Sequence, residues 1–298
     1  STTAVASSMR AKKVSAVVFP LDGAGASAAI AFRLAVLTCS GAGTKSSAKA
    51  TERGSSTKFS LTTASLLAAP PENLSTIRHV YHGAMTEPVF GRLATAMVTP
   101  FNAEGAVDLA KCQELATRLV DEQRNDIVLV NGTTGEAPTT TDVEKAQIVA
   151  AVAEAVGDRA AVIAGIGTND TTHSIELCRQ AASAGADGLL AVTPYYSLPP
   201  QDAIIAHFET LASVTDLPMM LYDIPHRTGR PIETDSLVQL AKHPNIVAVK
   251  DAKTDIAGSA QVLAATDLDY FAGDDAKLLP LLAIGGIGVV GTSTVFTG

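Results

Sequence analysis

A lysine that directly follows an apolar run is the sharpest chemical signal in the chain. Residues 246–249 are Ile-Val-Ala-Val, and Lys250 comes next. Lysine is seldom buried without a purpose. Burial at the end of this run would lower the pKa of the amine from about 10.4 and favour the free base that attacks carbonyl carbons. The alternative is an ordinary ion pair between Lys250 and Asp251 at the end of a strand.

Hydroxyl groups follow two other apolar runs. Tyr222 follows residues 219–221, where a phenol can relay protons between an amine and a carbonyl. Residues 132–136 read Gly-Thr-Thr-Gly-Glu before a predicted helix, and hydroxyls on flexible backbone there suit a small carboxylate. The alternatives are a core tyrosine whose hydroxyl bonds to backbone and a plain strand-to-helix turn.

Two further patterns concern anions. Arg227 lies in a loop with proline and glycine and offers a planar fork for a carboxylate, with a solvated arginine as the alternative. Glycines at 285, 286 and 288, together with the Gly-Thr-Ser segment at 291–293, raise the competing hypothesis of a phosphate site near strands seven and eight of a barrel. These three glycines lie before or at the start of the last predicted strand, which is the wrong end for such a site, so we favour the carboxylate.

Short apolar runs alternate with helical patterns from Phe90 onward, and Thr141 to Glu144 has the pattern of a capping box. Eight strand–helix units without an antiparallel signal predict an α/β fold, the (β/α)₈ TIM barrel. Catalytic groups of such barrels lie after the strands, where the residues above occur. The expected strands are residues 95–99, 127–130, 161–165, 188–193, 218–223, 246–250, 270–273 and 288–292.

Charge divides the chain into two predicted parts. Residues 1–84 hold nine basic and three acidic residues and are rich in Ser, Ala, Thr and Gly, as in a leader or another low-complexity extension. Residues 85–298 carry the barrel pattern. Only six residues follow the eighth predicted strand, so we expect a C-terminally truncated barrel without its last helix.

The overall composition excludes several classes of protein. A net charge of −8 argues against a nucleic-acid surface, and the apolar run at 28–39 is too short and interrupted to span a membrane. Three scattered cysteines indicate reduced thiols, and no histidine pairs with a cysteine or carboxylate at metal-ligand spacing. We expect a cytoplasmic enzyme without a metal, or a plastid enzyme if residues 1–84 are a transit peptide.

Taken together, these segments resemble the dihydrodipicolinate synthase and N-acetylneuraminate lyase family of class I aldolases. The resemblance covers about residues 91–298, and its spaced motifs occur in the order of that family. The motifs are residues 132–136 (GTTGE), 192–196 (VTPYY), 222–229 (YDIPHRTG), 249–252 (VKDA) and 273–275 (GDD).

The resemblance implies roles for the catalytic residues. Lys250 would form a Schiff base with pyruvate, and Tyr222, Thr133 and Tyr196 would relay protons. The tyrosine at the place of Tyr196 reaches into a neighbouring subunit in the family, which implies a homo-oligomer, either a dimer or a dimer of dimers. Thr134 would hold the pyruvate carboxylate.

The second substrate follows from the same resemblance. Arg227 would bind the carboxylate of L-aspartate 4-semialdehyde, and Gly273 and Val290 match positions that line the pyruvate pocket. The enamine of bound pyruvate would attack the aldehyde without a metal or organic cofactor. Two alternatives stay open: another pyruvate-dependent aldolase acting on a sugar acid, and a catalytically dead barrel. Arg227 favours the semialdehyde, because a polyol chain needs hydroxyl partners instead.

The resemblance also bears on regulation by lysine. Lysine-sensitive bacterial members carry histidines where this chain has Asp142 and Lys145, and a glutamate where it has His173. Lys145 would repel the ammonium groups of lysine, and a protonated His173 cannot accept their hydrogen bonds. We therefore expect weak or absent feedback inhibition.

Overall fold

The computed structural model describes residues 87–297, and these form a closed barrel of eight parallel strands. Each strand pairs with the next along the chain, and β1 pairs with β8 to close the barrel. The predicted TIM barrel is therefore confirmed. The strands are β1 (Leu93–Ala96), β2 (Ile127–Val130), β3 (Ala161–Gly165), β4 (Gly188–Val192), β5 (Met219–Asp223), β6 (Ile246–Asp251), β7 (Asp269–Ala272) and β8 (Gly288–Gly291).

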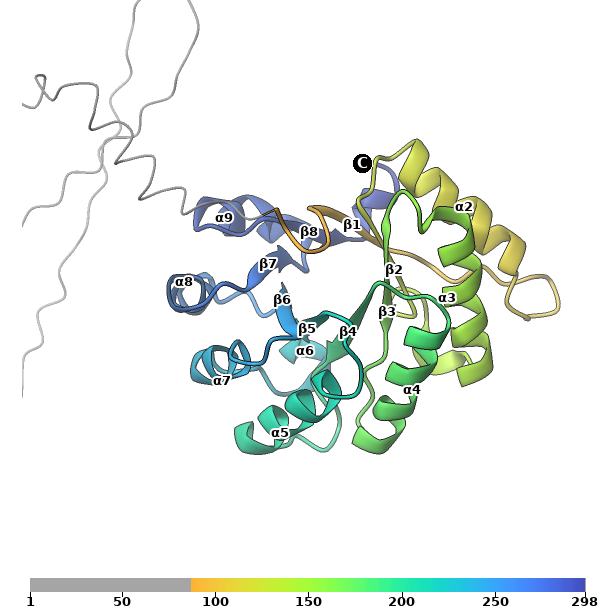
Figure 1. The fold of residues 1–298 in the computed structure, drawn as a ribbon. Helices are drawn as coiled ribbons and strands as arrows, with labels where there is room; N and C mark the ends of the chain where they lie inside the picture. Colours follow the sequence, from red (N-terminus) through yellow and green to blue (C-terminus); the bar gives the residue numbers. More distant parts are fainter. Residues whose placement is uncertain (1–86, 298) are drawn as a thin grey trace, which may run out of the picture. The chain divides into compact units, whose positions relative to one another are not determined.

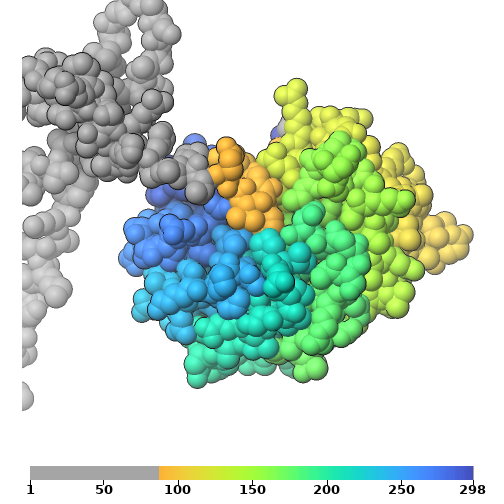
Figure 2. Space-filling view, viewed as in Figure 1, coloured from red at the N-terminus to blue at the C-terminus, as the bar shows by residue number. Residues whose placement is uncertain are grey.

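Helices between the strands form an outer ring (Figure 1). In space-filling view, successive segments follow one another around the barrel from orange through green to blue (Figure 2). After β8, the part of the chain that the structure describes contains only the short turn η3 (Ser293–Val295). The helices are α2 (Leu109–Asp121), α3 (Asp142–Val156), α4 (Thr171–Ser183), α5 (Gln201–Ala212), α6 (Pro225–Thr228), α7 (Thr234–Leu240), α8 (Ile256–Ala265) and α9 (Leu278–Ala283).

The first strand lies earlier in the chain than the apolar pattern predicted. We expected residues 95–99, but β1 is Leu93–Ala96. Met97 still donates its N–H to the carbonyl of Leu129 at 2.9 Å, after which the chain leaves the sheet. Because β1 pairs on both sides, its length is set by where β2 and β8 run beside it, which apolar character alone does not reveal.

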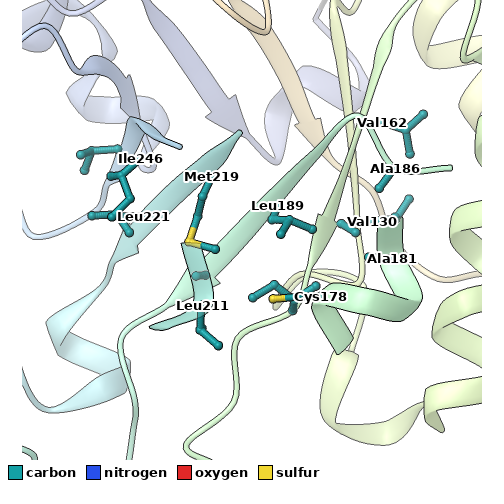
Figure 3. Packing of buried hydrophobic residues seen from close by; sticks show 14 of the residues in the cluster. Val130, Val162, Cys178, Ala181, Ala186, Leu189, Leu211, Met219, Leu221 and Ile246 are labelled. Atoms are coloured by element: carbon teal, nitrogen blue, oxygen red, sulfur yellow. The ribbon is translucent and has the colours of Figure 1, made fainter. Parts of the chain in front are cut away.

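Alternation along the strands separates two apolar layers. Met220, on β5, packs inside the barrel, whereas Met219 and Leu221 pack outward against the helices. Figure 3 shows part of the outer layer, where Met219 lies near Leu211 of α5. Each fully buried aliphatic side chain in these layers contributes about 1.5–3 kcal/mol of transfer free energy. The same alternation turns Tyr222 inward and Asp223 outward, which decides what each can do.

The loops at the strand ends are held by local bonds. The predicted capping box is confirmed: Thr141 and Glu144 bond to each other's backbone N–H and start α3. Thr99 donates to the carbonyl of Gly135 and thereby ties the β1 end to the Gly-Thr-Thr-Gly loop. These contacts fix the loop that leads into α3 against the barrel mouth.

The predicted extension at residues 1–84, and the boundary proposed at 85, lie outside the described residues. Within 87–297, no helix is long and apolar enough to cross a lipid bilayer.

Candidate active site

Tyr222 and Lys250 lie side by side at the ends of two adjacent strands. They are paired residues in the β5–β6 register, and each side chain is about one-twentieth exposed. The Lys250 Nζ lies 4.3 Å from the centre of the Tyr222 ring. An amine and a phenol are thus held together at the carboxyl ends of the strands, where barrel enzymes place their chemistry.

Burial prepares the amine for nucleophilic attack. Desolvation lowers the pKa of Lys250 to about 8, and the negative charge of Asp275 opposes that shift. The amine is therefore partly unprotonated near neutral pH, which a carbonyl nucleophile requires. The alternative of a Lys250–Asp251 ion pair is wrong, because the Asp251 carboxylate bonds to Ser259 and to the backbone of Lys253.

Burial acts on the phenol in the opposite direction. It raises the pKa of Tyr222, while the charge of Arg227 and a hydrogen bond with Thr133 lower it. Tyr222 therefore stays protonated and bonded to a threonine hydroxyl. A phenol linked in this way can pass a proton between a reacting group and the threonine.

A cavity of about 470 Å³ opens above these residues. Thr133, Tyr222 and Arg227 line it, from the loop after β2, the end of β5 and the short helix α6. Lys250 does not line the cavity itself. Its nitrogen faces the ring of Tyr222, and Tyr222 does line the cavity. Arg227 is exposed and places a guanidinium at the mouth, where it can meet a carboxylate.

Three other predicted residues surround the base of the site or lie near its rim. Gly273 is beside the lysine: a Cβ placed there would come within 3.1 Å of the Lys250 Cγ. Any side chain at Gly273 would therefore press on the lysine stem. Val290 is buried in the inner apolar layer. Thr134 is half-buried in the same loop as Thr133.

Tyr196 is a predicted site residue that neither lines this cavity nor packs against its base. Its side chain is 90% exposed, and its backbone has a φ of +73°, a conformation that costs free energy outside glycine. The preceding residue, Tyr195, lines the cavity instead. Within the described chain, Tyr196 contributes nothing to its own site.

Sequence reasoning missed three charged groups near the site. Asp275 acts on the charge of Lys250, although we assigned it no role. Asp223 and Lys253 form an ion pair buried behind the two reactive residues. A signal was present, because an aspartate directly follows both Tyr222 and Lys250 in strands that should be apolar throughout.

Among residues 87–297, no group of three or more His, Cys, Asp or Glu side chains could hold a metal ion. The chemistry available at this site is that of an amine, a phenol, hydroxyls and a guanidinium.

Comparison with known proteins shows which family the chain resembles. The model of the dihydrodipicolinate synthetase family matches residues 89–298. The chain is 65% identical over 214 residues to the 4-hydroxy-tetrahydrodipicolinate synthase of Cutibacterium acnes, which covers 72% of this chain and 73% of that protein. It is 61% identical over 205 residues to the enzyme of the same name from Acidothermus cellulolyticus, covering 69% of this chain and 66% of that protein.

Solved structures agree with the sequence comparison. A DHDPS from Cyanidioschyzon merolae with lysine bound is 44% identical, with a TM-score of 0.69 and coverage of 71% of this chain and 72% of that one. The dihydrodipicolinate synthase DapA-2 of Bacillus anthracis is 40% identical, with a TM-score of 0.69 and coverage of 70% and 72%. The chain thus spans about two thirds to three quarters of the length of these four proteins.

Proposed function

The chain belongs to the dihydrodipicolinate synthetase family, and on that premise we propose that its barrel condenses pyruvate with L-aspartate 4-semialdehyde through a Schiff base on Lys250. The product is 4-hydroxy-tetrahydrodipicolinate, in lysine and diaminopimelate biosynthesis, and the enzyme is a lyase. The observation that carries the proposal is the buried amine of Lys250, with its pKa lowered to about 8, beside Tyr222.

The first step forms the imine. The free amine of Lys250 attacks the ketone carbon of pyruvate, and the resulting carbinolamine loses its hydroxyl as water. The Tyr222–Thr133 pair supplies the proton that the leaving hydroxyl needs. The imine itself serves as the electron sink, so this chemistry uses a covalent lysine adduct in place of a metal or organic cofactor.

The second step forms the carbon–carbon bond. Loss of a proton from the pyruvate methyl group converts the imine into an enamine, whose terminal carbon attacks the aldehyde carbon. The aldehyde oxygen takes up a proton and becomes the hydroxyl of the product. The amino group of the semialdehyde then replaces Lys250 at the imine carbon, which closes the ring and frees the enzyme.

Four residues hold the two substrates in this proposal. Thr134 binds the pyruvate carboxylate through its hydroxyl and the adjoining backbone. Arg227 binds the carboxylate of the semialdehyde at the cavity mouth, where a guanidinium can form two parallel hydrogen bonds. Gly273 and Val290 shape the floor around the Lys250 stem.

Tyr196 completes the proton relay from a second copy of the chain. Its exposure and strained backbone support this role, because a large aromatic side chain held outward on a constrained loop suits an interface. The working enzyme is accordingly a homo-oligomer, a dimer or a dimer of dimers. A pyruvate-dependent sugar-acid aldolase is not favoured, because the similar proteins described above carry the names of the lysine-pathway enzyme.

Borohydride trapping tests the proposal. Reduction in the presence of pyruvate should add one reduced pyruvate to the peptide that contains Lys250, as measured by mass spectrometry. Lys250→Met should take up none, while Lys242→Met, which alters an exposed lysine outside the site, should be labelled like the parent chain. Label on another lysine of the folded parent would disprove the assignment.

A further inference from the structure

Two aspartates are buried directly behind the reactive pair. Asp223 follows Tyr222, Asp251 follows Lys250, and the two aspartates are themselves paired in the β5–β6 register. Asp223 is fully buried and Asp251 is 5% exposed. Because side chains alternate along a strand, both carboxylates face away from the barrel interior, toward the surrounding loops and helices.

One lysine pairs with one of these two buried carboxylates. The Lys253 Nζ lies 3.2 Å from the Asp223 Oδ2, and the Lys253 side chain is only 7% exposed. The backbone N–H of Lys253 donates to Asp251 Oδ1 at 2.9 Å, and Ser259 donates to the other oxygen of Asp251. Asp223 and Lys253 are therefore bound to each other in a setting where neither meets much solvent.

Both members of the ion pair also bond to the backbone of one residue in the neighbouring loop, Ile232. The Ile232 N–H donates to Asp223 Oδ1 at 3.1 Å, and Lys253 Nζ donates to the Ile232 carbonyl at 3.3 Å. Ile232 is fully buried and ends the loop that leaves β5 after Asp223. That loop includes α6 and carries Arg227. Its last part is therefore held to β5, the strand that precedes the loop, by the bond between Ile232 and Asp223.

Stability alone does not account for this arrangement. Two buried charges cost desolvation free energy, and well-packed apolar residues often stabilise a fold as well or better. Burial raises the pKa of Asp223 to about 6, although Lys253 lowers it, which shows how unfavourable the site is for a carboxylate. The pair forms directional hydrogen bonds to the backbone of Ile232, which apolar side chains cannot form.

We propose that Asp223 and Lys253 are positioning residues that hold the loop of Arg227 and thereby set the affinity for the carboxylate of the aldehyde substrate. The proposal rests on the proposed function for the identity of that substrate. Neither residue lines the cavity, so both act on the substrate through the loop that carries Arg227. Pyruvate, which reacts at Lys250 and not at Arg227, should be handled almost unchanged when the pair is altered.

Steady-state kinetics with both substrates test this split. In Lys253→Met the KM for L-aspartate 4-semialdehyde should rise about tenfold, with borohydride trapping of pyruvate within about twofold of the parent. Lys253→Arg keeps the charge and the donors and should restore most of the affinity. The exposed pair Lys111–Glu114 supplies a matched control, and Lys111→Met should leave both readouts unchanged.

A variant that removes both charges distinguishes a loss of positioning from a loss of folding. Lys253→Met leaves the buried Asp223 carboxylate without its partner, which can destabilise the fold. Asp223→Val/Lys253→Met removes both charges and leaves no unpaired carboxylate at position 223. Both should raise the KM for the aldehyde. In an Arg227→Ala background, the double variant should have little further effect, because the residue through which the pair acts is gone. Additive losses, or an equal fall in pyruvate trapping, would overturn the proposal.

A readout independent of turnover separates this inference from the proposed function. Amide hydrogen exchange of residues 224–232 should be faster in Asp223→Val/Lys253→Met, while exchange in β2 and β3 stays as in the parent chain. Unchanged exchange in 224–232 would overturn the inference even if the enzyme proved active. Absence of a pyruvate adduct in a parent chain whose loop responds as expected would instead refute the proposed function.

Discussion

Lys250 and Tyr222 occupy paired positions on β6 and β5, with the lysine nitrogen 4.3 Å from the centre of the tyrosine ring. The contact places the amine against an aromatic face and out of water, and burial is the main reason that its pKa is lowered. Reactivity at this site therefore depends on the register between two strands as much as on the lysine itself.

The lowered pKa of Lys250 predicts the pH dependence of imine formation. With a pKa of about 8, roughly one lysine in ten is a free amine at pH 7, against fewer than about one in a thousand at the usual pKa. The observed rate of pyruvate trapping by borohydride should rise with pH and level off above about 8. A rate still rising steeply at pH 10 would show that the amine is not desolvated.

Asp275 predicts a shift in that profile. Its negative charge holds the pKa of Lys250 higher than burial alone would, so Asp275→Asn should move the profile to lower pH. The shift should be small, because Asp275 is exposed and water screens its charge. Asparagine keeps an oxygen that can accept the N–H of Ser293, as Asp275 does now. A profile that moved to higher pH would contradict the assigned sign.

Much of this site could be predicted from residue order. Lys250 was recognisable because a charged residue ended an apolar strand, and Tyr222 because a phenol followed another. Local apolar patterns predict the strands that carry both residues. The carboxyl ends of parallel barrel strands lie at one face, which brings the two residues together. The length of β1 was not predictable in the same way, because it depends on where two strands distant in sequence run beside it.

The ion pair behind the site escaped prediction for a related reason. Asp223 and Lys253 are thirty positions apart, and although Asp223 ends an expected apolar strand, nothing in the sequence identifies Lys253 as its partner. Their contact arises only because β5 and β6 are neighbours and because the loop ending at Ile232 folds back between them. A role for Tyr196 in a neighbouring subunit is implied only by the resemblance and stays a prediction, since residue spacing does not reveal which copy of the chain a side chain serves.

Arg227→Ala should impair use of the aldehyde and spare the imine. Loss of a charge-assisted hydrogen bond costs about 1.5–3 kcal/mol, and the exposure of Arg227 favours the lower end, or roughly a tenfold rise in KM for L-aspartate 4-semialdehyde. Arg118→Ala changes an exposed arginine on α2, outside the cavity and outside the loop of Arg227, and serves as a control. Normal kinetics in Arg227→Ala would remove the carboxylate role and revive a sugar-acid substrate.

Residues 1–84 should be dispensable for catalysis. Every candidate site residue lies in the barrel, and the composition of 1–84 is that of a leader or extension. A chain beginning at Met85 should match the full chain in kcat and in KM for both substrates. Loss of activity in the shorter chain, with its circular dichroism unchanged, would show that the extension takes part in the reaction.

The last prediction concerns inhibition by lysine, since a similar structure, that of the Cyanidioschyzon merolae protein, has lysine bound. Asp142, Lys145 and His173 line the same cavity as Arg227. Here the Asp142 carboxylate already lies 2.9 Å from the His173 Nε2 and 3.9 Å from the Lys145 Nζ. Lys145 also donates to the Thr140 carbonyl, which fixes its amine inside the cavity wall.

An incoming lysine would therefore find its acidic partner occupied and a cation beside it. Because like charges repel most strongly where water is scarce, we expect little inhibition at millimolar L-lysine. Asp142→His/Lys145→His/His173→Glu places at these positions the residue types that sensitive relatives carry, and should bring inhibition into the millimolar range. Steady-state rates with and without L-lysine measure both effects. Strong inhibition of the parent chain would contradict this prediction. It would show that the Asp142 carboxylate can release His173 and bind the ammonium group of L-lysine instead.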